Sequence, residues 1–413
     1  DLNDEWTISC MNAKQIYLQI LVVLIAIGTI HPIFAADGKD PSELSAGNGQ
    51  AAQNEILDLA KILSKEEVEG IKPAAEEGSA SAQYYLGVFY QTGTRVKKDD
   101  ELAFGWFRKA AEQGHDRAQH LLGICYQEGI GVPKNSKEGF TWIKKAAEQG
   151  HVTAQLNLGI AYMHGKGVAR DPAKAVEWYK KAAQQGDANA QFFLGMCFFD
   201  GTGVANDNKQ AVAYVLKAAE AGHAKAMSNL GAFYQHGHGV AKDPEAAVKW
   251  YRKAAEIGNE IAQYNLSCCY SEGIGVTENA GESFKWCRMA AERGYVEAQY
   301  AMVFHYDEGY GVGKDPARAV WWCRKAAEQT HAGAQYDLGC YYEEGQCVTK
   351  DMNQAFQWFH KSAENNDPDG QYKLGICYRD GSGVEKNASI AERWFRKAAA
   401  QGQKEAKAQL ANP

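Results

Sequence analysis

Histidine is the residue type whose spacing in this sequence comes closest to a metal site. His236 and His238 flank Gly237, and His164 precedes His236 by 72 residues, which is twice a 36-residue period described below. Neutral imidazole is a frequent ligand of zinc and copper. No acidic or cysteine partner recurs beside these histidines, however, so the sequence predicts no metal-binding residue.

Motifs for nucleophilic or phosphate chemistry are also missing from the sequence. Gly165-Lys166-Gly167 has no following Ser or Thr and lies in a recurring Gly-x-Gly loop, which is typical of a structural turn. Neither His-Glu-x-x-His, Gly-x-Ser-x-Gly nor Ser-x-x-Lys occurs. We therefore predict no catalytic residue, no cofactor and no enzymatic activity.

The cysteines could form disulfides, but their positions favour apolar packing. Four cysteines share one recurring position with Phe89, Ala161 and Phe233, where an apolar side chain is expected, namely Cys125, Cys197, Cys269 and Cys377. Nine cysteines remain if Cys10 is removed with an N-terminal leader, an odd number that leaves at least one free thiol. A bridge between Cys269 and Cys287 is conceivable.

Composition excludes two broad classes of protein. Hydrophobic residues make up 45% of the 413 residues, more than a mostly disordered chain contains. The net charge of -7 argues against nucleic acid as the main partner, because phosphate binding requires clustered Lys and Arg.

A period of 36 residues organises most of the chain. It predicts nine complete units over residues 79–402, a truncated unit over 403–413, and a divergent N-terminal helical cap over 55–78. The marker of the period is an apolar residue at Leu86, Leu122, Leu158, Leu194, Leu230, Leu266, Met302, Leu338, Leu374 and Leu410.

Each unit is expected to contain two helices. In the first unit, Ala82, Leu86 and Tyr90 share one stripe of a helix, called helix A below, and helix B follows with Trp106 as its recurring aromatic residue. Recurring Asp or Asn, beginning with Asp99, are predicted N-caps of helix B, and recurring Gly are predicted left-handed C-caps. Thr330 replaces one such Gly and should strain or reshape its turn. We expect stacking of the units to bury the tryptophans.

The unit resembles the Sel-1-like repeat, a relative of the tetratricopeptide repeat. The resemblance rests on Ala-Gln-x-x-Leu-Gly-x-x-Tyr, Gly-x-Gly-Val and Ala-x-x-Trp-x-x-Lys-Ala-Ala-Glu-x-Gly. It implies an all-α fold, a right-handed superhelical α-solenoid, and a role as an adaptor or scaffold in protein complexes. A secreted, cysteine-rich bacterial branch of the family pairs cysteines seven residues apart, a spacing that is absent here.

The face of helix A opposite the packing stripe is the predicted binding groove. In a tetratricopeptide-like superhelix this face is concave, so it could hold a protein or peptide. The alternative is that these side chains pack against the next repeat. The expected partner-binding residues are tyrosines and asparagines, namely Tyr264, Tyr300, Tyr336, Tyr372, Asn157, Asn229 and Asn265.

The N-terminal region reads as an export signal. Residues 1–10 are interpreted as an upstream remnant, 11–35 as a signal peptide cleaved after Ala35, and 36–54 as a flexible linker. The apolar run Ile20 to Ile30 is shorter than the ~20 residues of a spanning helix, so no stable membrane span is expected after cleavage. We therefore expect a secreted or periplasmic protein.

Three functions remain open from the sequence. The first is a non-catalytic protein-binding scaffold, and the second is a secreted hydrolase of β-lactam or cell-wall substrates, as proposed for cysteine-rich relatives. The third is a lumenal adaptor of a membrane complex, for which the sequons Asn265-Leu266-Ser267 and Asn387-Ala388-Ser389 would permit glycosylation.

Overall fold

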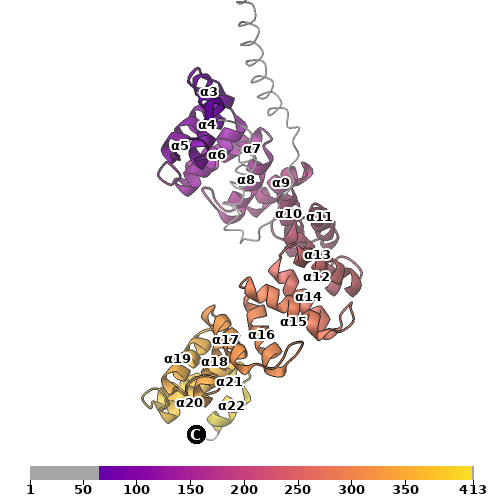
Figure 1. Cartoon of the computed structure of the whole chain (residues 1–413), viewed down its shortest axis with the longest axis vertical. Coiled ribbons are helices and arrows are strands. Elements are labelled where there is room, and N and C mark those ends of the chain that lie inside the picture. The colour runs from indigo at the N-terminus through magenta and orange to yellow at the C-terminus, as the bar shows by residue number, and fades with distance from the viewer. Residues whose placement is uncertain (1–64, 412–413) are drawn as a thin grey trace, which may run out of the picture. The chain divides into compact units, whose positions relative to one another are not determined.

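The computed structural model of the chain describes residues 65–411, which form twenty helices and no strand (Figure 1). Within the described residues, two compact units are distinguished, with the division between Ala154 and Gln155. The helices are α3 (Lys65–Glu76), α4 (Ala80–Thr92), α5 (Asp100–Glu112), α6 (Asp116–Glu128), α7 (Ser136–Glu148), α8 (Val152–His164), α9 (Pro172–Gln184), α10 (Ala188–Asp200), α11 (Asn208–Glu220), α12 (Ala224–His236), α13 (Pro244–Glu256), α14 (Glu260–Glu272), α15 (Ala280–Glu292), α16 (Val296–Glu308), α17 (Pro316–Glu328), α18 (Ala332–Glu344), α19 (Met352–Glu364), α20 (Pro368–Asp380), α21 (Ala388–Ala400) and α22 (Lys404–Ala411).

The even-numbered helices α4 to α20 are helix A of successive repeats, and the odd-numbered helices α5 to α21 are helix B. The all-α repeat architecture predicted from the period is therefore confirmed. The helical part of the predicted cap is α3, and α22 lies in the predicted truncated unit. The predictions for residues 1–10, 11–35 and 36–54, and the start of the cap, lie outside the described residues.

Capping fixes where each helix begins and ends. Positions 36 residues apart in the aligned repeats are called a column below. Each Asp or Asn in the column of Asp99 accepts a backbone N–H at the start of its helix B, as Asp99 does from Leu102 at 2.9 Å. Thr330 adopts φ 68° in the place of the C-cap Gly. Because a β-branched residue is disfavoured in left-handed backbone, Thr330 holds a strained turn of the ordinary shape.

The two helices of a repeat meet where the Gly of helix A faces one side chain of helix B. A Cβ on Gly87 would lie 2.7 Å from the Phe107 ring, and one on Gly339 would lie 2.5 Å from the Phe359 ring. Gly recurs at this position although it costs ~1 kcal/mol inside a helix. The ring fills the space that the absent side chain leaves, which makes this pair the centre of the repeat.

In two repeats the residue of helix A in this contact is larger than Gly, and the residue of helix B opposite it is smaller than in the other repeats. Ser267 stands in the Gly position of α14 opposite Cys287, and Val303 stands in that of α16 opposite Cys323; all four side chains are buried. Ser267 also donates a hydrogen bond to the Ser283 carbonyl at 2.7 Å. The larger residue on helix A is thus matched by a smaller one on helix B, which explains two of the cysteines by packing.

The tryptophans are less buried than the sequence suggested. Only Trp286, Trp322 and Trp358 are buried, and the other five of the column are half-buried. The residue after each Trp, such as Phe107 at 0% exposure, points into the core instead. A lysine covers the outer face of several indoles; the Lys181 ammonium lies 3.6 Å from the centroid of Trp178. The expectation of a Trp-filled core is therefore wrong for most repeats.

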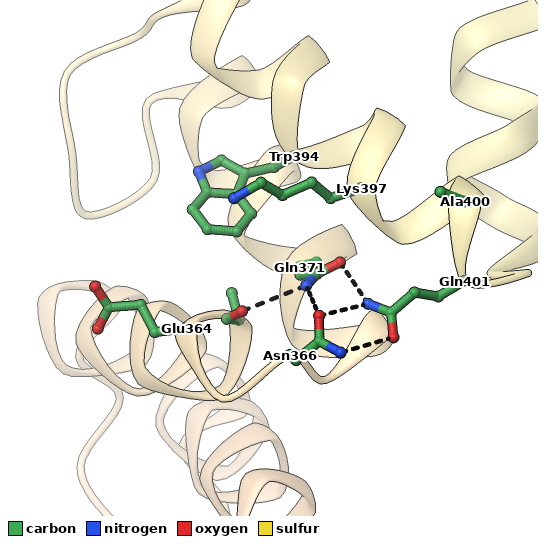
Figure 2. Close-up of a pocket in the computed structure, with 8 residues that line it drawn as sticks. Glu364, Asn366, Gln371, Trp394, Lys397, Ala400 and Gln401 are labelled. Atoms are coloured by element: carbon green, nitrogen blue, oxygen red, sulfur yellow. Dashed lines mark hydrogen bonds between the residues drawn. The ribbon is translucent and has the colours of Figure 1, made fainter.

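A ladder of amide side chains joins consecutive helices. The buried Gln of helix A donates to a carbonyl of the preceding helix, as Gln83 does to Ala75 of α3 at 3.0 Å. Its oxygen accepts from an amide at the end of helix B of its own repeat, as from Gln113 at 2.7 Å. Figure 2 shows the equivalent bond from Gln401 to Gln371, 2.9 Å long, with Asn366 hydrogen-bonded to both. The ladder satisfies polar groups that burial would otherwise leave unpaired.

The ladder is interrupted in three consecutive repeats. Ala221 stands where Gln191 should find its donor, and the buried Gln191 Oε1 accepts no hydrogen bond. Gln263 Oε1 is likewise unpaired, with Arg293 in the donor position. The repeat between them replaces both amides with Met227 and Ile257.

Adding the missing amide donor should stabilise the repeats in which the ladder is interrupted. We expect Ala221→Gln to stabilise α10 and α11 by about 1 kcal/mol, because a buried acceptor gains its donor. Hydrogen exchange of the amides in these helices measures the gain locally. Ala221→Met has similar length without the amide and should give no such gain; equal protection in both variants would contradict the ladder.

Histidines cap four of the A helices. His115, His151, His223 and His331 each accept a backbone N–H at Nδ1, with the Ala226 N–H 3.0 Å from His223. The His223 ring also stacks on Phe192 at 4.8 Å. Burial, with a smaller contribution from Lys225, lowers the pKa of His223 to about 4.

Acid should therefore weaken the start of α12. The folded protein holds His223 neutral, whereas the unfolded chain protonates near 6.5, so stability is present above 6.5 and is lost as pH falls toward 4. We expect a loss of about 2 kcal/mol at pH 5. His223→Asn provides a cap that does not titrate, as Asn259 does for α14. Hydrogen exchange of α12 at pH 7 and pH 5 should differ less in this variant than in the wild type.

The described cysteines form no disulfide, including the conceivable pair Cys269 and Cys287. Cys347 is exposed and the others are buried or half-buried. Ser267 of the first glycosylation sequon is buried and hydrogen-bonded, and Asn387 of the second is the N-cap of α21. Both sequons thus lie in residues that the fold already uses.

Candidate binding surface

The four predicted tyrosines lie on successive A helices, α14, α16, α18 and α20, and all are half-buried. Tyr300 packs on His331 with 4.3 Å between ring centroids, and Tyr264 packs on Tyr295 at 5.4 Å. His331 and Tyr295 are the N-cap residues of the next A helices. Tyr336 and Tyr372 lie near Phe359 and Phe395 of helix B. Each ring therefore packs in the solenoid on one side and keeps part of its surface open.

The predicted asparagines differ in how accessible their amide groups are to a partner. Asn157 is 7% exposed, too little for its amide to pair with the backbone of a partner. Asn229 donates to the Lys225 carbonyl of its own helix at 2.9 Å, and Asn265 is half-buried. Asn157 and Asn229 belong to α8 and α12, whereas the tyrosines belong to α14, α16, α18 and α20.

A cavity of about 340 Å³ opens between α14, α16 and α18, within the second unit. Two of the predicted tyrosines, Tyr264 and Tyr300, form part of its wall. Phe304 lies beside them and is 52% exposed, with Tyr310 as its ring neighbour at 5.6 Å. The remaining lining residues are Glu297, Ala301, Val303, Asp307, Glu308 and Asp337.

The polar part of this lining is entirely acidic or phenolic. Tyr300 donates a hydrogen bond to Asp337 at 2.8 Å, and Tyr341 donates to Asp307 at 3.0 Å. Burial raises the pKa of Asp337, against the Tyr300 hydrogen bond, which lowers it. No Lys or Arg lines the cavity. The arrangement presents fixed carboxylates beside open aromatic surface.

Sequence reasoning missed Phe304 and the carboxylates. Phe304 occupies the apolar column of Val88, whose other members are aliphatic, methionine or cysteine, so it is the one aromatic residue there. That departure from the column could have identified Phe304 from the sequence. Nothing in the sequence indicated that Asp307 and Asp337 line the same cavity, because they belong to different repeats and different columns.

A second, larger cavity of about 670 Å³ lies at the end of the array between α19 and α21 (Figure 2). Trp394 and Lys397 border it, with the ammonium 4.0 Å from the indole centroid. Its amides Asn366, Gln371 and Gln401 bond to one another as part of the ladder. Since these polar groups already serve the fold, this cavity is the weaker candidate.

The rings of His236 and His238 lie 5.7 Å apart, and among residues 65–411 no three His, Cys, Asp or Glu gather as a metal site would require. In the same part of the chain, no helix combines the length and apolarity needed to cross a bilayer.

Repeating helix pairs, an amide ladder between them and an open aromatic face together define an all-α repeat protein of the tetratricopeptide-like solenoid class. The Sel1 repeat model matches nine consecutive segments from 80–115 to 368–403, close to the predicted 79–402. The chain belongs to the Sel1 repeat family. Sel1 repeat proteins are generally scaffolds for protein interactions and are typically non-catalytic.

Two solved structures are similar over most of their length. One is a protective antigen present in uropathogenic Escherichia coli strains displaying an SLR fold, with 35% identity, a TM-score of 0.63, and coverage of 83% of this chain and 81% of that chain. The other is a Sel1 repeat protein from Oxalobacter formigenes, with 35% identity, a TM-score of 0.59, and coverage of 74% and 89%. No curated protein matches the chain significantly.

Proposed function

We propose that the protein is a non-catalytic scaffold that binds an extended protein segment on the A-helix face of α14, α16 and α18. The observation that carries the proposal is Phe304, a large aromatic side chain that is 52% exposed and lines a cavity together with two of the predicted tyrosines. Exposed aromatic residues around a cavity supply much of the affinity in peptide recognition. Tyr336, Tyr372 and Asn265 would extend the same surface along neighbouring helices.

Truncating Phe304 should separate binding from stability. We expect Phe304→Ala to weaken partner binding at least about tenfold while the thermal midpoint stays nearly constant, because an exposed ring contributes little to the core. The partner is first isolated by affinity capture, and its Kd for purified wild type and variant is then compared. Trp321→Ala is the matched control: Trp321 is 51% exposed on α17, a B helix. Equal loss in both variants would contradict a surface on the A helices.

The competing hydrolase gains no specific support. Cleavage of a β-lactam or an acyl bond needs a nucleophile beside a general base, and the cavity lining includes no serine, cysteine, lysine or histidine. Cleavage of a cell-wall polysaccharide by paired carboxylates is the remaining chemistry for such a site. Purified protein is expected to hydrolyse neither a chromogenic β-lactam nor peptidoglycan above the background rate, and turnover lost in Asp337→Asn would replace the scaffold proposal.

We also propose that the protein is exported through residues 11–35. The support is the cationic start, short apolar run and small residues at the cleavage position. N-terminal sequencing of protein recovered outside the cytoplasm should begin at Ala36. Recovery of exported protein that retains Met11 would contradict cleavage.

A further inference from the structure

The carboxylates of the cavity are departures from the repeat pattern. Positions that join the helices recur from repeat to repeat, whereas Asp337 is the only acidic residue in its column. Asp307 shares its column with one other acid, Glu343, which pairs with Lys373. Repeats that lack these carboxylates form the same helix pairs. Helix pairing therefore does not require Asp307 or Asp337.

These two carboxylates also lack a cationic partner among the described residues. Each accepts a tyrosine hydroxyl, Asp307 from Tyr341 and Asp337 from Tyr300. Glu308 and Glu297 also line the cavity, but each has an ion-pair partner: Lys314 lies 3.8 Å from Glu308, and His331 lies 3.4 Å from Glu297. The pKa of Asp337 is raised by burial first; the Tyr300 hydrogen bond and the charge of His331 lower it, and the charges of Asp367 and Asp307 raise it further. Negative charge is thus held close together at some cost, and an external cation would relieve it.

The aromatic residues beside the carboxylates suit a cation that carries a hydrocarbon chain. Lysine and arginine combine an apolar stem with a charged end, and the stem packs well on aromatic rings. Phe304 and Tyr300 offer open ring surface next to Asp307 and Asp337 within one cavity of about 340 Å³. A carboxylate that is already oriented by a tyrosine hydroxyl forms a strong, charge-assisted hydrogen bond with such a group.

We infer that this cavity binds a lysine or arginine side chain of the partner segment, with its charged end between Asp307 and Asp337 and its stem against Phe304 and Tyr300. The inference rests on the proposed function and specifies the chemistry of the partner. Charge complementarity selects this occupant over an acidic or purely apolar segment, because those would leave the two half-buried carboxylates without a cation.

The test is selection from a random peptide library displayed on phage, with the purified protein immobilised. Peptides recovered on the wild type should be enriched in Lys or Arg at one position relative to the unselected library. The same selection on Asp307→Asn/Asp337→Asn should lose that enrichment, since the Asn side chains keep the shape and remove the charge. A selected peptide with its cationic residue replaced by acetyl-lysine or citrulline should bind the wild type at least about tenfold more weakly.

The net charge of -7 could attract cationic peptides without a specific site, so the control removes two charges elsewhere. Glu128→Gln/Asp200→Asn changes exposed residues at the ends of α6 and α10 and should retain the enrichment of the wild type. Circular dichroism verifies that both double variants are folded.

The possible outcomes separate this inference from the function on which it rests. Binders without Lys or Arg enrichment, lost in Phe304→Ala, would overturn the cationic occupant and leave the scaffold surface standing. Enrichment lost equally in the control variant would also overturn it, as non-specific attraction. Recovery of no binders above an empty surface would overturn both proposals.

Discussion

Phe107→Ala is expected to lower the free energy of unfolding of its repeat by about 3–5 kcal/mol. Phe107 is completely buried, and its ring occupies the space left by Gly87 of α4, so truncation leaves a cavity that the two helices cannot close. Hydrogen exchange of α4 to α6 measures the loss, because stability in a repeat array is local and one global transition does not describe it.

Trp106→Ala is the control in the same helix. Trp106 is half-buried and carries Lys109 over its ring at 4.2 Å, so truncation removes surface packing and should cost less than the change at Phe107. A larger loss of protection for Trp106→Ala would restore the view that the tryptophans form the core.

Gly339→Val should be comparably damaging and should be rescued by Phe359→Cys. A Cβ at Gly339 would lie 2.5 Å from the Phe359 ring, a distance that forces the helices apart. Phe359→Cys alone leaves a cavity and should lower the free energy of unfolding by about as much as other large-to-small changes in a core. Together the two changes reproduce the arrangement of Val303 and Cys323 two helices earlier, and the buried state of that pair indicates that the combination packs.

A double-mutant cycle measures the compensation. We expect the pair to be more stable than the sum of the single changes by about 2–3 kcal/mol, read from hydrogen exchange of α18 and α19. Gly339→Val combined with Phe395→Cys in the next repeat supplies the matched control, because Phe395 faces Gly375 and not Gly339. Non-additivity of the same size in that control would show that the effect is not local packing.

The role of cysteine illustrates what a column of aligned repeats can and cannot reveal. The sequence indicated that cysteines fill apolar positions, and the nine described cysteines are unpaired. It did not reveal why Cys287 and Cys323 follow their tryptophans, because the matching residues Ser267 and Val303 lie 20 residues earlier on another helix. The reason is that two side chains on different helices fill one space, so the size of each depends on the other. A single column of aligned repeats does not show this dependence.

The binding surface shows the same division. Tyr264 and Tyr300 were identified because they recur on the A-helix face, and both line the cavity. Asn157 was chosen by the same argument and is buried. Asp307 and Asp337 were not identified, because Asp337 is the only acid in its column and Asp307 shares its column with a single other acid, Glu343.

By itself, the sequence determined the repeat, its two helices and their caps, because these depend on local periodicity and on backbone groups within one turn. Family membership followed from the same recurring residues. Only the tertiary structure decided that Phe107 and its equivalents, not most tryptophans, fill the core, and that the amides form an interrupted ladder. It alone placed Phe304 beside Asp307 and Asp337. Those features depend on distances between side chains of different helices, which packing sets and periodicity does not.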